Sequence, residues 1–310
     1  MDIIALIGAF GGGALAAAIG GVTSFVFTGI FVLVGVGGGV AGAAGAPMIG
    51  AMAFGSLFGP HVAFGGAVAG AAYSKSKGLI DAGADIVTPL FKTGDASVLL
   101  VAGVFGVIGF LLNYLFATII GAGMIGNAGW TDTVALTVFT SDTIVRFVFT
   151  KSGMTGKYTG SEPRKYFPEG KRLSFLLVEG LLIGIAIGSV AGVFKGLGTP
   201  EGDYLLSQTG VLGFGIGAVA LLYLGMGQPM EGFHHVILPA GGAAAAVLMG
   251  TGDPIVAIII AGIMGAFNAV LGEVVGMTIN SHVDSHIDPP AVVIMLTTLI
   301  NVWVLTPMFA

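Results

Sequence analysis

The chain has 310 residues, of which 55% are hydrophobic and 9% are charged, and its formal net charge is −5. A water-soluble domain cannot carry this composition, because its surface would be one continuous apolar patch. The small acidic charge gives no indication of nucleic-acid binding, and the absence of cysteine excludes disulfides, iron–sulfur clusters and thiolate metal sites.

Apolar segments follow one another from the start of the chain. Residues 3–74 contain no Asp, Glu, Lys or Arg, which is enough for three helical crossings of a bilayer at about 20 residues each. The first segment lacks a basic region and a cleavage site, so we interpret it as a retained span rather than a signal peptide. The sequence predicts about ten transmembrane helices, at residues 3–20, 22–43, 47–74, 97–117, 132–149, 173–196, 209–226, 230–250, 254–276 and 288–306. The expected fold class is an all-α integral membrane protein.

The two halves of the chain resemble each other. The matched segments are, in chain order, 8–20 with 184–196, 59–73 with 233–247, 101–110 with 260–269, and 132–141 with 288–297. These matches align His61 with His235 and Asp132 with Asp288. They predict a five-span repeat at 1–150 and a second one at 173–310.

An odd number of spans per repeat means that the second repeat should enter the membrane upside down. The linker 151–172 holds six of the 11 Lys and Arg residues, and the positive-inside rule therefore places it in the cytoplasm. The loop 75–96, two spans earlier, also carries lysines, whereas its counterpart near residues 251–253 carries none. This opposite charge bias is what an inverted repeat predicts, and it places both termini outside the cytoplasm.

The third span of each repeat is expected to be interrupted. Pro60 precedes His61 in the first, and Pro229 and Pro239 flank the histidine pair of the second. Proline removes a helical donor, and a broken helix is tolerated in a membrane only where protein or a water-filled cavity satisfies its backbone. Interrupted segments at matching places in two inverted halves indicate a transport site.

We therefore expect a path for a solute or ion between the repeats, near His61, His235, Asp132 and Asp288. Both aspartates precede an apolar run, so each is a good helix N-cap. Helix N-termini directed at the interior would also attract anions. Each histidine has a plainer role as well, as a partner for backbone groups that the prolines release.

Four more charged side chains fall inside expected spans. Asp142 and Arg146 are four residues apart, close enough to pair on one helix face. We expect mutual neutralisation, with a role in the solute path as the alternative. Glu179 and Glu273 have no such local partner, and a carboxylate inside a membrane is a candidate for proton coupling.

The stretch NSHVDSHIDPPA (280–291) concentrates imidazoles and carboxylates in the connection before the last span. Three interpretations stay open. Asp288 caps the last helix and the rest is solvated, or the stretch is a proton or substrate gate, or His282, His286 and Asp284 bind a divalent metal ion such as Zn, Mn, Ni or Fe.

The stretches SLFGPHVAFGGAVAGAAY (56–73) and TDTVALTV (131–138) resemble a group of uncharacterised prokaryotic multi-pass membrane proteins with no assigned activity. The resemblance implies a prokaryotic cell membrane and a lipid bilayer as the surrounding partner. The expected architecture is similar to that of inverted-repeat secondary transporters, a likeness of fold and not of site.

The leading functional hypothesis is a transporter or channel for a small solute or ion, assembled as a homo-oligomer through small-residue helix faces. The alternative is a non-catalytic structural subunit of a larger membrane complex. A third hypothesis, an intramembrane metal-dependent enzyme, rests only on the loop 280–291. No motif in a credible context supports catalysis.

Overall fold

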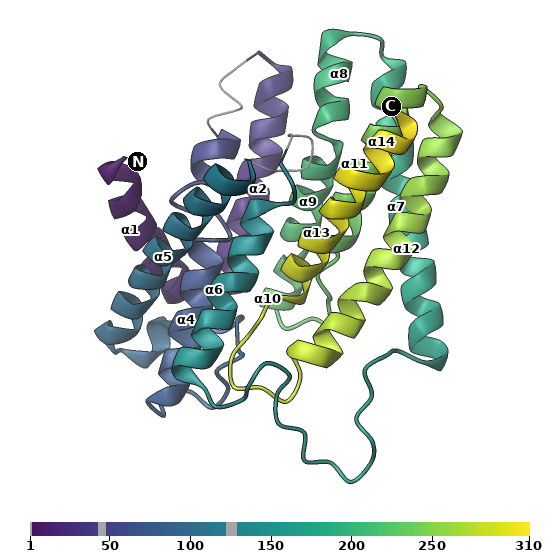
Figure 1. Ribbon diagram of the computed structural model, residues 1–310. Coiled ribbons are helices and arrows are strands. Elements are labelled where there is room, and N and C mark those ends of the chain that lie inside the picture. The colour runs from purple at the N-terminus through teal and green to yellow at the C-terminus, as the bar shows by residue number, and fades with distance from the viewer. Residues whose placement is uncertain (1, 43–47, 122–128) are drawn as a thin grey trace.

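The computed structural model describes residues 2–42, 48–121 and 129–310 (Figure 1), and these residues form helices and no strand. The elements of the first half are α1 (Ile3–Ile19), α2 (Gly21–Val40), η1 (Met48–Ala53), α4 (Ala63–Ser76), η2 (Leu90–Thr93), α5 (Ala96–Ile120) and α6 (Thr133–Phe149). The elements of the second half are α7 (Gly170–Gly196), α8 (Pro200–Ser207), α9 (Thr209–Ala220), α10 (Leu222–Gly225), α11 (His234–Thr251), α12 (Pro254–Ile279), α13 (Pro289–Ile300), η3 (Asn301–Leu305) and α14 (Thr306–Phe309).

Several of these helices are suited to a bilayer. Five segments are long and apolar enough to cross a membrane, namely α2, α5, α7, α12 and the continuous stretch Pro289–Phe309. A sixth is formed if α8 and the following segment Thr209–Gly225, which are bent by 57°, count as one span. The described part of the chain is thus all-helical, with several helices that could cross a membrane. The remaining expected spans coincide with elements that are shorter, broken or more polar, such as the 17-residue helices α1 and α6.

Aspartate side chains start four of the long helices at matching places in the two halves. Asp95 accepts a hydrogen bond from Ser97 N at the start of α5, and Asp253 accepts from Ile255 N at the start of α12. Asp132 and Asp288 do the same for α6 and α13. An N-cap satisfies one backbone donor that the first helical turn leaves free, so these four residues explain where the helices begin.

Each half contains a pair of helices packed backbone to backbone. A methyl group at Gly13 of α1 would collide with the carbonyl oxygen of Ala102 in α5, and one at Gly184 of α7 would collide with that of Ala261 in α12. The contact is possible because glycine has no side chain, so neighbouring helices approach closely. The sequence match of 8–20 with 184–196 aligns Gly184 with Gly8, whereas in the structure the glycine of α1 with the matching contact is Gly13, five residues later. Glycines recur so often in these segments that the sequence does not define the register of the match.

The two halves meet through helices at matching places in their order. α2 packs against α9, with Gly29 beside Ala218 and Val32 beside Gly215. α6 packs against α13, with Thr131 Oγ1 donating to Met295 O at 2.5 Å and Asp288 N donating to Asp142 Oδ2 at 3.1 Å. In both pairs, residue numbers rise along one helix as they fall along the other. Both pairs are therefore antiparallel.

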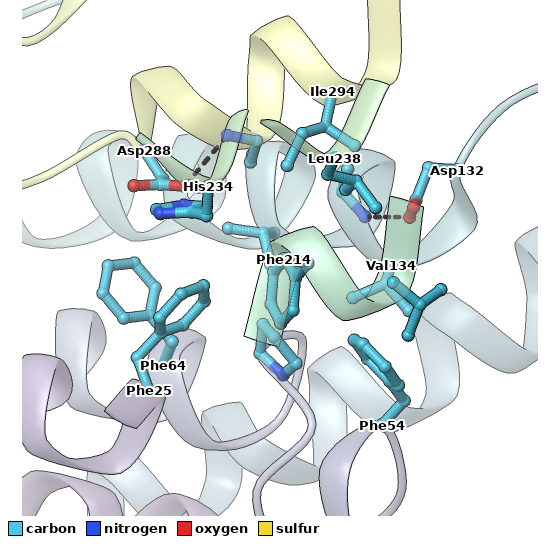
Figure 2. A pocket seen from close by; sticks show the side chains of 15 residues that line it. Phe25, Phe54, Phe64, Asp132, Val134, Phe214, His234, Leu238, Asp288 and Ile294 are labelled. Carbon is cyan, nitrogen blue, oxygen red and sulfur yellow. Dashed lines mark hydrogen bonds between the residues drawn. The ribbon is translucent and has the colours of Figure 1, made fainter. Parts of the chain in front are cut away.

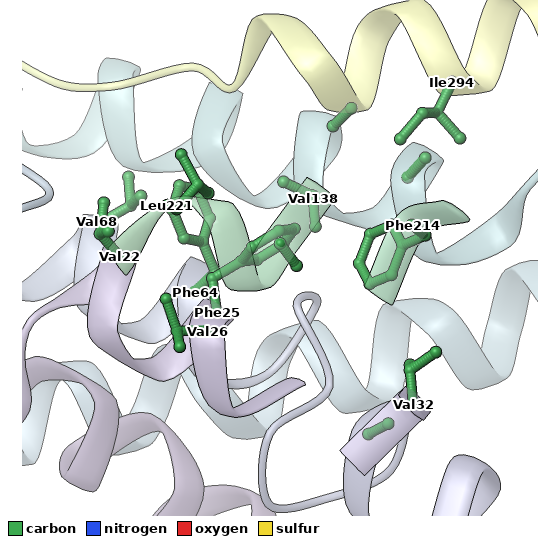
Figure 3. Packing of buried hydrophobic residues seen from close by; sticks show 14 of the residues in the cluster. Val22, Phe25, Val26, Val32, Phe64, Val68, Val138, Phe214, Leu221 and Ile294 are labelled. Atoms are coloured by element: carbon green, nitrogen blue, oxygen red, sulfur yellow. The ribbon is translucent and has the colours of Figure 1, made fainter. Parts of the chain in front are cut away.

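The main hydrophobic core lies across this junction (Figure 3). It combines Phe25 and Val32 of α2 and Phe64 of α4 with Phe214 of α9 and Ile294 of α13. A second core cluster belongs to the second half and lies among α7, α11 and α12. Burial of apolar side chains from both halves in one cluster holds the halves together.

The third segment is interrupted in the first half only. Residues 54–62 are not helical, and they are buried from Phe58 to Val62. Thr28 Oγ1 donates to Phe58 O at 2.7 Å, and Val62 N donates to Gly59 O at 2.8 Å, so protein groups satisfy this backbone. The break expected at Pro239 is not formed, because α11 runs through it. Proline removes only one helical donor, and α11 is held in place by its buried small residues and by the amide of Asn301, which donates to Pro239 O.

The long connection between α6 and α7 lies at one end of the molecule, and the two ends of the chain lie toward the other (Figure 1). Arg164 fastens this connection to the last turn of α12, where its guanidinium donates to the carbonyl oxygens of Met277 and Thr278 at 2.7 and 3.0 Å. A cation at a helix C-terminus satisfies free carbonyl groups and opposes the helix dipole.

Candidate functional site

The N-termini of α6 and α13 converge on the interior between the two halves. Asp132 is 7% exposed, and its Oδ1 accepts from Ala135 N at 2.9 Å. The other cap, Asp288, accepts from Ala291 N at 2.9 Å through Oδ2. The prediction that both residues are N-caps is therefore confirmed. Both carboxylates line the same interior region.

A cavity of about 40 Å³ lies between these two aspartates (Figure 2). This volume is room for about three or four water molecules, at roughly 10–15 Å³ each. Four phenylalanine side chains contribute to its wall, namely Phe25, Phe54, Phe64 and Phe214. Figure 2 shows Asp288 and His234 on one side of Phe214 and Asp132 on the other. The cavity is thus an apolar space with an acidic group toward each end.

The wall of the cavity is assembled from matching residues of the two halves. In the register that aligns Asp132 with Asp288, the wall also contains Ala135 with Ala291 and Val138 with Ile294. In the register that aligns residues 59–73 with 233–247, the wall contains Pro60 with His234 and Phe64 with Leu238. The cavity therefore lies where residues that match in the sequences of the two halves line a common space.

A second cavity, of about 160 Å³, adjoins the first. The two share four wall residues, Phe25, Phe64, His234 and Asp288. The second cavity is also lined by Ile86, from the loop between α4 and η2, and by residues of α10 and the start of α13. The shared side chains thus separate the central cavity from a larger one on the side of the basic linker.

The wall of the central cavity is mostly apolar, and its carboxylates are Asp132 and Asp288. No Lys or Arg of the described residues lines it, and its titratable groups are Asp132, Asp288 and His234. Asp288 Oδ1 lies 3.3 Å from Nε2 of His286, whose other ring nitrogen lies 3.0 Å from the side-chain amide of Asn280. His286 therefore supports Asp288 from the loop side, whereas Asp132 has no side-chain partner among the described residues.

The direct ion pair expected between Asp142 and Arg146 is not formed within the described part of the chain. Both side chains are fully buried. The Arg146 guanidinium donates instead to Ser285, through both its hydroxyl and its carbonyl, and to the carbonyls of Met154 and Ile279. Its charge is used to join α6 to the loop before α13. Asp142 turns the other way, accepts from Asp288 N at 3.1 Å, and leaves Oδ1 without a described partner.

The residues proposed as metal ligands have separate partners. His282 has a backbone φ of 60° and lies against the ring of Tyr158, while Asp284 Oδ2 accepts from the Ser152 hydroxyl at 3.3 Å. His286 is bonded to Asn280 and Asp288. Among residues 2–42, 48–121 and 129–310, no group of three His, Asp or Glu side chains could hold a metal ion. The three candidate ligands are therefore not gathered around one point in the described structure, and their contacts hold the loop 280–288 to its surroundings.

The histidines that align in the repeat do not line the cavity. His61 is 1% exposed in the interrupted segment, and its carbonyl oxygen packs against Gly109 of α5. His235 packs its ring against Gly272 of α12. The cavity takes the residue before each of them, Pro60 and His234. His234 and His235 are neighbours on α11 and therefore point about 100° apart, so only one of them faces the cavity.

Glu179 of α7 and Glu273 of α12 differ in their hydrogen bonding. Glu273 does have a partner, since its carboxylate accepts from Arg172 at 2.7 Å, and the same guanidinium donates to Glu231 at 2.6 Å. Glu179 is half-buried on α7 and forms no hydrogen bond to another described side chain. Neither residue lines the central cavity.

The fold and its site define a class, an all-helical protein with several helices that could span a membrane and with a cavity between its two halves. Residues 1–162 and 182–309 match a family of unknown function, DUF7973, and the chain belongs to that family. No curated protein and no solved structure matches it.

Proposed function

We propose that the protein is a transporter or channel for a small solute or ion, and that the solute passes through the central cavity. The observation that carries this proposal is the position of the cavity. It lies between the halves and is bordered by the N-termini of α6 and α13, and residues that match in the sequences of the two halves line it. Transport sites in repeat-built carriers lie at such interfaces, where helix ends supply polar groups inside the membrane.

The proposal includes an inverted repeat of two five-span units. Support comes from the antiparallel packing of α2 with α9 and of α6 with α13. If the members of each pair are equivalent, the second unit has the opposite orientation to the first. Rocking of one unit against the other would then expose the cavity alternately to the two sides.

The membrane orientation follows from charge. The linker 151–172 carries six basic residues, and the positive-inside rule places it in the cytoplasm. The larger cavity near Ile86 and Leu224 then belongs to the cytoplasmic side of the path. We also propose a prokaryotic cell membrane as the location and a homo-oligomer as the assembled form, as expected from the sequence.

The test is flux through reconstituted vesicles. Purified protein is placed in liposomes, and currents on a solid-supported membrane and vesicle swelling are recorded for a panel of small ions and neutral solutes. Ala135→Phe and Ala291→Phe each put a ring into the cavity wall and are expected to abolish the flux that the parent shows. Ile259→Phe is the matched control, because Ile259 is 54% exposed on α12 and contributes nothing to the cavity.

Unchanged flux in a folded Ala291→Phe protein would exclude the cavity as the path. A parent protein without flux for any solute in the panel would count against transport. If that protein also co-purifies with other membrane polypeptides, the alternative of a structural subunit is supported. Folding is checked by gel filtration and thermal unfolding, because overpacking a core costs about 1–3 kcal/mol.

A further inference from the structure

The central cavity combines aromatic rings with two carboxylates, of which Asp288 has an imidazole partner and Asp132 has no side-chain partner among the described residues. The ring of Phe25 lies 5.9 Å from that of Phe64 and 5.3 Å from that of Phe214, with edge-to-face geometry. The ring of Phe54 lies 5.5 Å from that of Phe214. Aromatic rings carry negative charge on their faces and attract cations, most strongly where water is excluded.

The carboxylates add charge of the same sign. Asp132 and Asp288 lie toward opposite ends of the cavity (Figure 2), and the described part of the wall contains no basic side chain other than His234. Behind Asp288, the carboxylate of Asp142 is fully buried and keeps one oxygen without a described partner. Buried carboxylates without a counter-charge are costly in a membrane interior, and a bound cation would offset this cost.

The wall also limits which cation can bind. Sodium and the divalent ions need several oxygen ligands at fixed distances, whereas most of this wall consists of Phe, Val, Ala, Leu and Ile side chains. An alkylammonium ion does not need such a shell, because its methyl groups contact rings while its charge is attracted by them and by the carboxylates. The small volume, with a larger cavity next to it, favours an ion of few heavy atoms.

We infer that the cavity binds a small monovalent organic cation of the ammonium type, held by Phe25, Phe64 and Phe214 between Asp132 and Asp288. This inference rests on the proposed function only in taking the cavity as the solute site. It adds the substrate class. The carboxylates of the cavity select against anions, and its rings favour a cation over a neutral solute.

Calorimetric binding to the purified full-length protein in detergent tests the inference without any transport step. The probe is tetramethylammonium, and tert-butanol is the neutral comparison with the same number of heavy atoms. Tetramethylammonium is expected to bind at least tenfold more tightly than tert-butanol. Phe25→Leu, which removes a ring and keeps an apolar side chain, and Asp132→Asn, which keeps the cap and removes the charge, are each expected to weaken its binding at least fivefold.

Phe267→Leu serves as the control, since Phe267 is 47% exposed on α12 and lies outside the cavity. The Phe267→Leu protein is expected to bind tetramethylammonium as tightly as the parent does.

Equal binding of the two probes by the parent, or no binding of tetramethylammonium, overturns the inference. This comparison uses the parent protein alone and does not depend on the folding of a variant. If Phe25→Leu does not fold, Phe214→Leu takes its place. Binding with the expected pattern but without flux supports the cation site and rejects transport. If neutral solutes cross the membrane, Ala291→Phe blocks their flux and tetramethylammonium does not bind, transport is supported and the cation site is rejected.

Discussion

Arg146 is a fully buried guanidinium whose hydrogen bonds all go to neutral groups. It donates four hydrogen bonds to Ser285, Met154 and Ile279, at 2.7 to 3.0 Å. The flat guanidinium presents several donors in a fixed arrangement, so one side chain can join α6 to the linker, to the end of α12 and to the loop before α13. The residue thereby positions the loop that leads to Asp288.

Arg146→Gln should lower the free energy of unfolding by about 3 kcal/mol or more, because it leaves buried carbonyl groups without donors at about 1–3 kcal/mol each. Arg146→Lys should lower it less but measurably, since an ammonium cannot reproduce the planar set of donors. Thermal unfolding in detergent measures both changes. Lys151→Gln, at an exposed position of the linker, is the control, and an Arg146→Gln protein that melts like it would contradict this account.

Helix contacts in this protein depend on which face of a helix a glycine occupies. On α1, Gly13 is buried against Ala102 and Gly106 of α5, while Gly11 is exposed with no atom near the position of an added methyl group. The two glycines are only two residues apart, so they test the same helix on different faces. Their intrinsic cost to the helix is the same, about 1 kcal/mol relative to alanine.

Gly13→Ala should therefore destabilise the protein by about 1–3 kcal/mol, because the methyl group has to push α1 away from the α5 backbone. Gly11→Ala should leave stability unchanged or raise it by up to about 1 kcal/mol, because only the helix propensity changes. Thermal unfolding of the two single variants in one detergent compares them. Equal effects of the same sign would show that the close packing of α1 with α5 is absent.

At the scale of the whole molecule, the ends of the chain and the basic linker lie at opposite ends of the helical bundle (Figure 1). If the linker is cytoplasmic, Asp2 and Ala310 should both face outward. The protein contains no cysteine, so single cysteines can be placed without background. A membrane-impermeant maleimide should label Asp2→Cys and Ala310→Cys on intact cells, and Lys157→Cys only after the membrane is opened.

Labelling of Lys157→Cys on intact cells would reverse the proposed orientation. If one terminus is labelled from outside and the other only from the cytoplasm, the model of two halves with equal numbers of spans is excluded. Two halves with five spans each place both termini on the side opposite the linker, and two halves with an even number place both on the linker side. A permeant maleimide that labels all three variants is the control for accessibility.

Local signals in the sequence determined the elements. The apolar runs predicted α1, α2, α5, α7 and α12, because a helix that crosses a bilayer must be apolar over about 20 residues. Asp132 and Asp288 were predicted as N-caps, because the cap and the donors that it satisfies are only a few residues apart. The repeated sequence predicted that Asp132 and Asp288 occupy matching places, and both line the central cavity.

Only the tertiary structure decided which side chains meet. Arg146 bonds to Ser285, 139 residues away, in place of its neighbour Asp142, and Glu273 bonds to Arg172, 101 residues away. The cavity contains His234 and four phenylalanines that hydrophobicity alone does not separate from the other buried aromatics. The rotation of a helix about its axis and the register between helices are set by close packing of many small contacts, and no local stretch of sequence contains that information.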